Sequence, residues 1–311
     1  MYCMEQNKIY IGIDIGGTKT AVSAGDSSGK ILKKKAFPTD PKPETALENI
    51  FRETGALVAE FGKESIPAIG ISCGGPLDSE KGIIQSPPNL PGWDDVAIIK
   101  MLEDKFSLPA FIENDANACA LAEWYYGAGR GCRNLVFLTF GTGLGAGLIL
   151  DGKLYRGSSG MAGEAGHIRM TDEGPLGYGK RGSLEGWCSG GGLSRAYADR
   201  YGEQITAREI CARAEQGDEK ALAVINQSAF MLGRFLALVI DIINPDRIVI
   251  GSIFARSEKL FRSRIEAIIR EECLPICASV CSVHPAALGE SLGDIAALCV
   301  AVNGVSIGVD P

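Results

Sequence analysis

The chain has 311 residues, of which 46% are hydrophobic and 22% charged, and its formal net charge is −7 at pH 7. This length is sufficient for two lobes with separate cores, and the composition is ordinary for a folded protein. The acidic balance, with both signs interspersed, argues against a nucleic-acid partner, because a nucleic-acid surface needs a basic stripe. A small anionic ligand is not excluded, since it needs only local hydrogen-bond donors.

Neither a secretory signal nor a membrane span is expected. The first residues, MYCMEQNK, lack an apolar run, and the longest apolar segment, residues 230–243, is shorter than the ~20 residues of a span. The ten cysteines show no Cys-x-x-Cys spacing, which indicates reduced core residues in a cytoplasmic protein. A metal-binding face of Cys273, Cys277 and Cys281 is disfavoured, because Pro275 should break any helix between them.

The hydrophobic pattern of the first part of the chain predicts three short strands joined by turns, followed by alternating helices and strands. Prolines at positions 41 and 43 should open the first helix. The expected elements are strands at 9–14, 21–25 and 31–37, a helix to about 61, a strand at 66–72, a helix near 95–106, a strand at 110–112 and a helix at 115–126.

The second part repeats this order of elements. We expect strands at 134–140 and 148–150, helices at 194–201 and after a capping box at Thr206 and Glu209, a helix at 219–243, a strand at 247–250, a helix at 258–272, a strand at 278–283 and a closing helix at 289–302.

The repeated order predicts an α/β protein of two similar lobes with the ligand cleft between them. We place the first lobe at residues 1–116 and the second at 117–289. The C-terminal helix, at about 290–306, is expected to pack back on the first lobe.

Two glycine-rich turns, DIGGTKT and GTGLGAG, occupy the same place in the two halves. Neither has the Walker spacing, but glycine lets backbone N–H groups approach a phosphate without a Cβ clash, and Thr18 and Lys19 add donors. Asp14, at a strand end, could hold a hydrated Mg²⁺. Each turn alone also fits an ordinary hairpin, whereas the pair would grip the phosphates of ATP from two sides.

The segment ENDANACALAE begins at a strand end and enters a helix. Asp115 could be a general base that accepts the proton of a substrate hydroxyl, and Asn114 could hold a neighbouring hydroxyl. The helix N-terminus would keep the carboxylate ionised at neutral pH. The same residues also fit a plain helix cap.

The stretch GEAGHIRMTDEGPLGYGKRGSLE holds Glu164, His167 and Glu185. These three side chains could converge on the hydroxyls of a sugar ring, and they could equally be solvated charges of a surface loop. A zinc site is disfavoured, because His167 is the one good ligand in this stretch.

The motifs DIGGTKT, CGGPLDSEKG, NLPGW, ENDANA, GTGLGAG, GEAGH and NPDRIVIG together resemble the ROK family (repressor, open reading frame, kinase) of sugar kinases, over essentially the whole chain. The resemblance implies the two-lobed, ribonuclease H-like fold of the hexokinase and actin-like ATPase superfamily. It also implies phosphorylation of a hexose or N-acetylhexosamine by ATP with Mg²⁺, usually at the 6-hydroxyl, in a protein that is usually a homodimer.

The resemblance assigns a role to each matching position. Asp115 matches the catalytic base. Sugar-binding positions correspond to Gly75, Asn89, Asn114, Asp115, Glu164, His167 and Glu185. ATP and phosphate positions correspond to Asp14, Gly16, Gly17, Thr18, Lys19, Gly141, Thr142, Gly143, Gly145 and Gly251.

Two segments depart from the family pattern. The usual loop carries three cysteines that bind structural zinc together with the histidine, but here the first is Gly177, the last is Ser183 and the middle one has no counterpart. We therefore expect no zinc, with Tyr178 and Arg181 compensating through packing or hydrogen bonds. The second departure replaces three glycines by Gly251-Ser252-Ile253, which affects the adenosine end of the nucleotide site.

Two other functions have to be weighed against the sequence. A DNA-binding repressor of this family would need a further domain before the first phosphate strand at about Ile9, so we do not expect this function. A sugar-sensing protein without turnover is compatible with the lost cysteines and with the altered segment at Ser252. Asp115 and the two phosphate turns favour the kinase.

Overall fold

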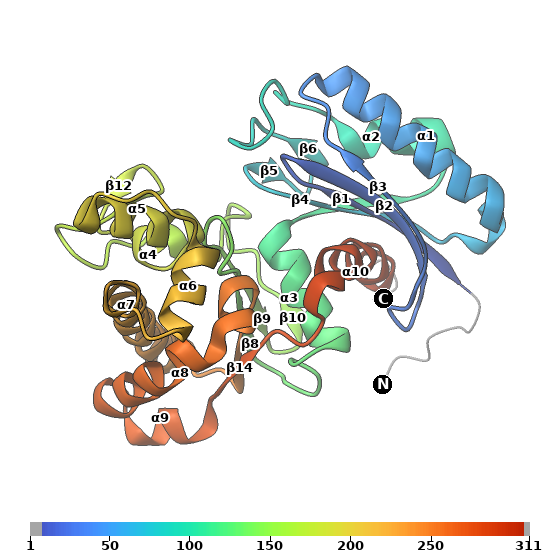
Figure 1. The fold of residues 1–311 in the computed structure, drawn as a ribbon. Coiled ribbons are helices and arrows are strands. Elements are labelled where there is room, and N and C mark those ends of the chain that lie inside the picture. The colour runs from blue at the N-terminus through green and yellow to red at the C-terminus, as the bar shows by residue number, and fades with distance from the viewer. Residues whose placement is uncertain (1–7, 308–311) are drawn as a thin grey trace. The chain divides into compact units, whose positions relative to one another are not determined.

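The computed structural model describes residues 8–307, and of the ten cysteines Cys3 lies outside this range. The described chain divides into two units, each with a sheet of its own (Figure 1). The first unit comprises the residues up to Tyr126 together with those from Glu290 on, and the second runs from Gly127 to Gly289. The sequence placed this boundary after residue 116. The division falls later because the helix that begins at Asp115 packs against the C-terminal helix.

The first unit is built on a five-stranded sheet in the order β3-β2-β1-β4-β7. The first three strands pair antiparallel, whereas β1, β4 and β7 run parallel to one another. A small hairpin, β5 (Leu77–Asp78) and β6 (Ile83–Ile84), follows β4. The strands of the main sheet are β1 (Ile9–Ile15), β2 (Lys19–Asp26), β3 (Ile31–Pro38), β4 (Ile69–Cys73) and β7 (Ala110–Asn114).

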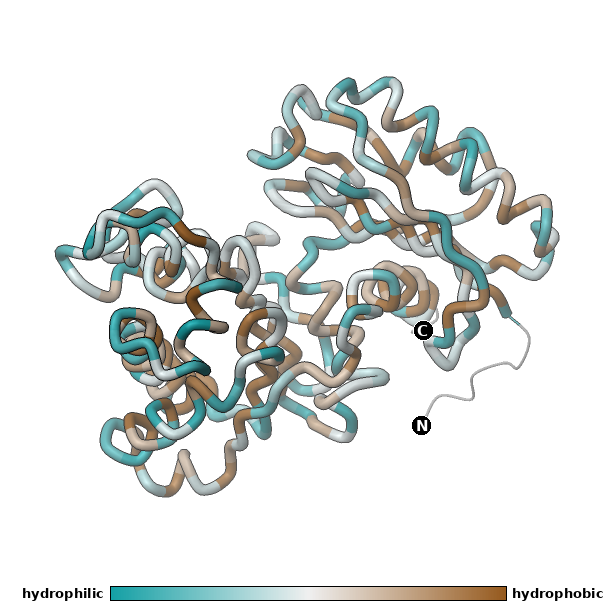
Figure 2. The backbone as a smooth tube through the Cα atoms, viewed as in Figure 1, coloured by the Kyte–Doolittle hydropathy of each residue, from teal (hydrophilic) through white to brown (hydrophobic). Residues whose placement is uncertain are grey.

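Helices cover both faces of this sheet, as Figure 1 shows. Side chains of α1 (Pro43–Phe61) and α2 (Ile98–Phe106) pack with Ile11 and Ile13 of β1 into one hydrophobic core. On the other face lie α10 (Leu292–Ile307) and α3 (Asp115–Tyr126). In Figure 2, hydrophilic and hydrophobic residues alternate along α1, as expected for a helix with one buried face. A short 3₁₀ turn, Lys63–Ser65, follows α1, and another, Gly289–Ser291, leads into α10.

Two paired glycines on neighbouring strands allow α10 to lie close to the sheet. Gly12 of β1 pairs with Gly70 of β4. A Cβ atom on Gly70 would lie 2.2 Å from the carbonyl oxygen of Ala297 and 2.4 Å from the amide nitrogen of Ala301. Both neighbours are backbone atoms of α10, so a side chain at Gly70 would force the helix away from the sheet.

We therefore expect Gly70→Ala to lower the free energy of unfolding by about 1–3 kcal/mol, the usual range for overpacking a core. Gly55→Ala is the matched control, because Gly55 lies inside α1 and its new Cβ would meet only carbons of the Phe106 ring, the nearest at 3.5 Å. Alanine at that site should stabilise the protein by up to about 1 kcal/mol. Denaturant unfolding of the two variants measures both changes, and a Gly70→Ala protein as stable as the wild type would contradict this packing.

The second unit repeats the order of the first, as the sequence predicted. Its five-stranded sheet has the order β10-β9-β8-β13-β14, again with antiparallel strands on one side and parallel strands on the other. The strands are β8 (Leu135–Leu138), β9 (Ala146–Leu150), β10 (Lys153–Leu154), β13 (Arg247–Ile250) and β14 (Ser282–Pro285).

Helices α7 (Glu219–Ile243) and α8 (Ser252–Glu272) contribute most of the helical part of this unit's core. α7 is long and apolar enough to cross a membrane by length and composition, but 61% of its apolar window is buried inside the protein, as in a core helix. The remaining helices are α4 (Leu184–Trp187), α5 (Gly190–Tyr201), α6 (Ala207–Glu215), α9 (Pro275–Val280) and the 3₁₀ turn Ala165–His167.

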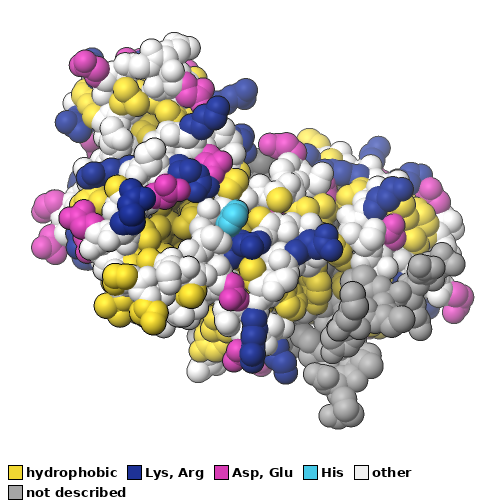
Figure 3. Space-filling model, turned by 90° about the horizontal axis from the view of Figure 1, so that it is seen from below, with side chains coloured by type: hydrophobic (Ala, Val, Ile, Leu, Met, Phe, Trp, Pro, Cys, Tyr) yellow, Lys and Arg dark blue, Asp and Glu magenta, His cyan; other side chains and the backbone are white. Residues whose placement is uncertain are grey.

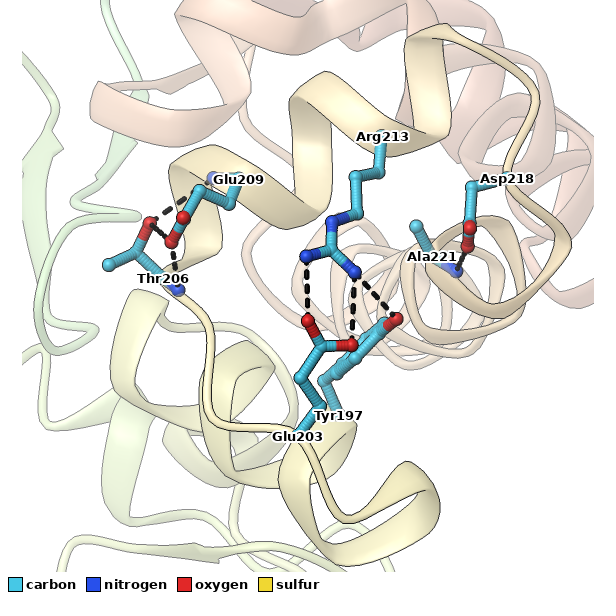
Figure 4. Close-up of polar contacts among 7 residues, drawn as sticks. All are labelled: Tyr197, Glu203, Thr206, Glu209, Arg213, Asp218 and Ala221. Carbon is cyan, nitrogen blue, oxygen red and sulfur yellow. Dashed lines mark hydrogen bonds and ion pairs between the residues drawn. The ribbon is translucent and has the colours of Figure 1, made fainter.

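The predicted capping box is confirmed at the start of α6 (Figure 4). The Thr206 hydroxyl accepts a hydrogen bond from the Glu209 amide at 3.2 Å, and the Glu209 carboxylate accepts one from the Thr206 amide at 2.8 Å. Arg213, near the end of α6, reaches the Glu203 carboxylate at 2.7 Å. These contacts fix α6 at both ends.

The sequence was wrong about the segment after α8. A strand was expected at 278–283 and Pro275 was expected to break any helix, but Pro275 instead opens α9, and β14 begins only at Ser282. Proline is favourable in the first turn of a helix, where its missing N–H would have no partner. Among residues 8–307 no group of three or more potential metal ligands occurs, and this includes the cysteines at 273, 277 and 281.

Candidate functional site

In the first unit, the predicted site residues gather at the carboxyl ends of three parallel strands. Asp14 pairs with Ser72 across β1 and β4, and Cys73 pairs with Asn114 across β4 and β7. Asp115 follows directly as the first residue of α3. Because the carboxyl ends of parallel strands share one edge of the sheet, Asp14, Asn114 and Asp115 lie at the same edge, where α/β proteins commonly bind ligands.

The carboxyl group of Asp14 has a raised pKa. Burial, and then the negative charges of Asp294 and Asp115, raise its pKa to about 6 against the opposing effect of Lys34 and Lys19. Asp294, in the first turn of α10, is itself buried and forms an ion pair with Lys34 at 2.5 Å. An ionised Asp14 is therefore costly in this structure, and a cation or a phosphate-bound metal would relieve the cost.

The turn between β1 and β2 is held by backbone and hydroxyl groups, which leave its tip exposed. The Gly16 amide donates to the Lys19 carbonyl at 3.0 Å, and the Thr39 hydroxyl donates to the Gly16 carbonyl at 2.6 Å. Gly17, Thr18 and Lys19 are exposed. The exposed donors of Thr18 and Lys19 are thus presented by a fixed turn.

The predicted sugar-site loops contact these same residues. A Cβ atom on Gly17 would lie 2.3 Å from the Asn89 carbonyl oxygen, so the loop that carries Asn89 lies directly on the phosphate turn. A Cβ atom on Gly75 would lie 3.2 Å from the amide nitrogen of the Asn114 side chain. The first unit therefore brings together all the site residues that the sequence assigned to it.

Asp115 is exposed, and its backbone is fixed by its neighbours. The Ala116 amide donates to the Asn114 side chain at 3.0 Å and to the Asp115 carboxylate at 2.8 Å. Glu113 is buried and accepts hydrogen bonds from the Asn117 side chain at 2.9 Å and the Asn114 amide at 3.0 Å. The start of α3 is thus held from inside, while the exposed Asp115 can meet a ligand.

In the second unit, the turn GTGLGAG joins β8 to β9. The Thr139 amide donates to the Gly145 carbonyl at 2.9 Å, which closes the turn. Its Gly141 carbonyl accepts a hydrogen bond at 2.7 Å from the amide of Gly190, the first residue of α5. Thr142 is exposed. The turn is therefore anchored on a helix N-terminus and presents Thr142 to solvent.

Glu185 links this turn to the glycine-rich stretch that begins at Gly163. One carboxylate oxygen accepts from the Leu144 amide at 3.1 Å, and the other accepts from the Tyr178 amide at 2.8 Å. A Cβ atom on Gly143 would lie 2.7 Å from the same carboxylate. Glu185 therefore holds two loops together, a structural role that the sequence did not reveal.

Glu164 and His167 both contact Tyr178. The Tyr178 hydroxyl donates a hydrogen bond to the Glu164 carboxylate. The rings of His167 and Tyr178 meet edge to face, with centroids 5.1 Å apart. Glu164, His167 and Glu185 are thus brought to one place in this unit, as predicted, and Tyr178 connects them.

A two-stranded hairpin occupies the place where the family pattern has its cysteines. The hairpin consists of β11 (Leu176–Gly177) and β12 (Lys180–Arg181). The Ser183 hydroxyl donates to the Gly177 carbonyl at 2.7 Å and accepts from the Gly186 amide at 3.1 Å. The two positions that match outer cysteines are therefore joined by a hydrogen bond. The Arg181 side chain donates to the Gly174 carbonyl at 3.4 Å.

The altered segment after β13 keeps a glycine-like backbone. Ser252 has φ of 53°, a left-handed conformation that side chains other than glycine, asparagine and aspartate rarely adopt. A Cβ atom on Gly141 would lie 3.4 Å from the Ser252 hydroxyl. Ser252 thus lies beside the GTGLGAG turn, next to Gly251, the last predicted nucleotide-site residue.

Comparison with known proteins identifies the family. The pattern described as the ROK family matches residues 10–303. The chain belongs to the ROK family. It is 32% identical over 306 residues to a glucokinase of Halalkalibacterium halodurans, with 92% of each chain covered. It is also 33% identical over 242 residues to an N-acetylmannosamine kinase of Citrobacter koseri, covering 78% of this chain and 82% of that one.

Solved ROK structures share the fold. The ROK hexokinase of Thermus thermophilus superposes with a TM-score of 0.85 at 30% identity, covering 96% of this chain and 100% of the other. The ROK glucokinase of Streptomyces griseus, solved with glucose and AMPPNP, gives a TM-score of 0.77 at 31% identity, covering 95% and 100%. The actin-like ATPase fold inferred from the sequence is thereby confirmed, and these ROK relatives support a sugar kinase.

The ROK family also contains regulators. A putative xylose repressor of a Caldicellulosiruptor species is 31% identical over 287 residues, which cover 86% of this chain and 72% of the repressor. Family membership therefore leaves two kinds of function to weigh against the residues of the site.

The sequence missed four contributors that the structure places beside the predicted site residues of each unit: Lys34 and Asp294 beside Asp14, Glu113 beneath Asn114, and the linking role of Glu185. Asp294 could have been noticed as an acidic residue in the first turn of a helix. Lys34 lies in a run of three lysines, which gives no signal for one member.

Proposed function

We propose that this ROK protein phosphorylates a hexose or an N-acetylhexosamine at its 6-hydroxyl, with ATP as the donor. Relatives named glucokinase and N-acetylmannosamine kinase support this class of substrate. The observation that carries the proposal is the exposed Asp115 carboxylate, held on a rigid helix start at the same sheet edge as the phosphate turn and Asp14. A base and a phosphate-binding turn at one edge are the parts that a phosphoryl transfer to a hydroxyl requires.

In this proposal the site residues of both units contribute to one reaction. Asp115 accepts the proton of the attacking hydroxyl, and Asn114, Glu164, His167 and Glu185 bind the other hydroxyls of the sugar, with Gly75 and Asn89 on the lining loops. The two phosphate turns, at 16–19 and 141–145, hold the nucleotide together with Gly251. Positioning of the hydroxyl against the γ-phosphate then supplies most of the rate acceleration.

The site residues of the first unit fit a magnesium ion that arrives with ATP. Mg²⁺ prefers oxygen ligands and keeps several waters when it is bound through phosphates and one or two carboxylates. Asp14 would offer one such carboxylate, whose raised pKa reflects an unmet negative charge. Residues 8–307 contain no cluster of three or more ligands that would hold a metal alone. When bound, the ion would neutralise charge on the phosphates.

We also propose that the chain binds no structural zinc, because hydrogen bonds of Ser183 and Tyr178 close the loop at the positions of the missing cysteines. A cytoplasmic location and a homodimer likewise stay predictions. No nucleic-acid partner is proposed, and Figure 3 shows basic and acidic side chains interspersed over one face of the molecule.

The function is tested by a coupled assay of ADP release over glucose, mannose, fructose, allose, N-acetylglucosamine and N-acetylmannosamine. We expect at least one sugar to give turnover in the usual enzymatic range of about 1–10³ per second with Mg²⁺ and ATP. Absence of ADP release with every sugar in the panel would contradict the proposal.

A second candidate is a ROK protein that senses a sugar without turning it over, and the similarity to a putative xylose repressor favours it. The same assay separates the two candidates when sugar binding is measured in parallel by calorimetry. Binding of a sugar with no ADP release would support the sensor, whereas turnover of a bound sugar supports the kinase.

A further inference from the structure

Tyr178 has an unusual backbone conformation for an aromatic residue. It lies at the tip of the β11–β12 hairpin, whose two-residue turn is formed by Tyr178, with φ of 51°, and Gly179, with φ of 75°. A turn with positive φ at both central residues strongly favours asparagine, aspartate or glycine at the first of them. A bulky residue held in this region is strained, and such strain is concentrated at functional sites.

The contacts of Tyr178 show what its side chain does there. Its hydroxyl donates to Glu164, its ring contacts that of His167, and its amide donates to Glu185. One residue thus touches all three polar side chains that the second unit offers to a sugar. The hydrogen bond to Glu164 uses the Oε2 atom, and its other oxygen has no hydrogen-bond partner among the described residues.

A role in packing alone does not account for this residue. Tyr178 is 43% exposed and is not one of the residues of the main hydrophobic core of this unit. An Asn-Gly turn would form the same hairpin with less strain. The contacts of the side chain, and not the conformation of the turn, therefore account for a tyrosine at this position.

We propose that Tyr178 is a positioning residue for sugar binding, which orients the Glu164 carboxylate and the His167 ring where the family pattern uses a metal-bound loop. This inference rests on the proposed function. With Oε2 held by the tyrosine, Oε1 of Glu164 is left to accept a hydrogen bond from a sugar hydroxyl. The geometry also places specificity at this point, since the orientation of Glu164 decides which hydroxyl it can meet.

The protonation of Tyr178 suits this role over the whole working pH range. Burial raises the pKa of its hydroxyl, and the hydrogen bond and negative charge of Glu164, with the charge of Glu185, raise the pKa further. The hydroxyl therefore remains a donor wherever Glu164 is ionised.

The first test is Tyr178→Phe, which keeps the ring and removes the hydroxyl. We expect the Kd for glucose, measured by calorimetry without nucleotide, to rise about tenfold, within the range expected for a lost hydrogen bond to a charged group. The value of kcat at saturating glucose should stay within about twofold, because the base is untouched. Tyr155→Phe is the matched control, since Tyr155 lies in the same unit with 49% of its side chain exposed, and its Kd should equal that of the wild type.

A double-mutant cycle shows whether Tyr178 acts through Glu164. Glu164→Gln should weaken glucose binding, and adding Tyr178→Phe to it should weaken binding much less than the tenfold seen alone, because the two residues act as one pair. Fully additive effects would overturn the inference. So would an unchanged Kd in Tyr178→Phe.

Tyr178→Asn separates positioning from stability. The relaxed turn should leave the thermal unfolding temperature equal or higher, while the Kd for glucose rises at least as much as in Tyr178→Phe. A variant that is less stable and yet binds glucose normally would show that Tyr178 serves the fold alone.

Failure of this inference can be told apart from failure of the proposed function. If the wild type phosphorylates glucose while both variants bind it normally, only the inference falls, whereas a wild type that neither binds nor phosphorylates any sugar of the panel removes both.

Discussion

Replacing Asp115 by asparagine is expected to lower kcat by a factor of about 10²–10⁴, the usual cost of removing a general base. The amide keeps the size of the side chain and one acceptor oxygen, but it cannot accept the proton of the attacking hydroxyl. The helix start is held by Glu113 and Asn114, so the fold should be unaffected. Steady-state ADP release with the preferred sugar measures the change.

The binding of sugar decides how this loss is interpreted. The Kd of Asp115→Asn for the sugar should stay within a few-fold of the wild-type value, because the interaction is made mainly in the transition state. Asp104→Asn is the matched control, since Asp104 is 65% exposed and pairs with Lys100 on the surface of α2. Near wild-type kcat in Asp115→Asn would refute the assignment of the base.

Replacing Asp14 by asparagine is expected to stabilise the nucleotide-free protein and to impair catalysis. Burial and the neighbouring charges of Asp294 and Asp115 raise the Asp14 pKa from 3.8 to about 6, so the native state holds this proton more tightly than the unfolded chain. The contribution of protonated Asp14 to the free energy of unfolding is fully present below about pH 4 and is lost as the pH rises through about 6. At pH 8 the free energy of unfolding of Asp14→Asn should therefore exceed that of the wild type by up to about 3 kcal/mol, at about 1.4 kcal/mol for each pKa unit.

The pH dependence gives the sharpest check on Asp14. Denaturant unfolding at pH 8 should show the Asp14→Asn variant as the more stable protein, and the difference should shrink as the pH falls through 6. Activity with Mg²⁺ and ATP should fall by an order of magnitude or more, because the carboxylate is no longer present beside the phosphates. A stability difference that does not depend on pH, or unchanged activity, would contradict the role given to Asp14.

Much of the fold could be predicted from the sequence, because both halves repeat one hydrophobic pattern. The strands at Ile9 and Leu135 are mainly apolar and are followed by glycine turns, and the capping box at Thr206 marks a helix start. The segment from Pro275 could not be predicted in the same way, since proline both ends helices and begins them. The later unit boundary depends on α3 packing against α10, a contact between distant parts of the chain.

The site residues that belong to sequence motifs could be predicted, but the roles that depend on single contacts could not. Asp14 and Asp115 lie at strand ends, and parallel pairing brings them to one edge without further information. The roles of Glu185 and Tyr178 depend on hydrogen bonds across a hairpin of glycines and polar residues, for which periodicity gives no signal. The lost cysteines pointed to this loop, but only its folded conformation shows which contacts hold it together.

The most direct test of the central claim is phosphorus NMR of reactions of the wild-type protein with ATP, Mg²⁺ and each sugar of the panel in turn. We predict a new sugar-phosphate resonance that grows in step with ADP and is assigned to the 6-position by its coupling to the sugar protons. ADP that appears with inorganic phosphate alone for every sugar, or mixtures that do not change although a sugar is bound, would contradict the account.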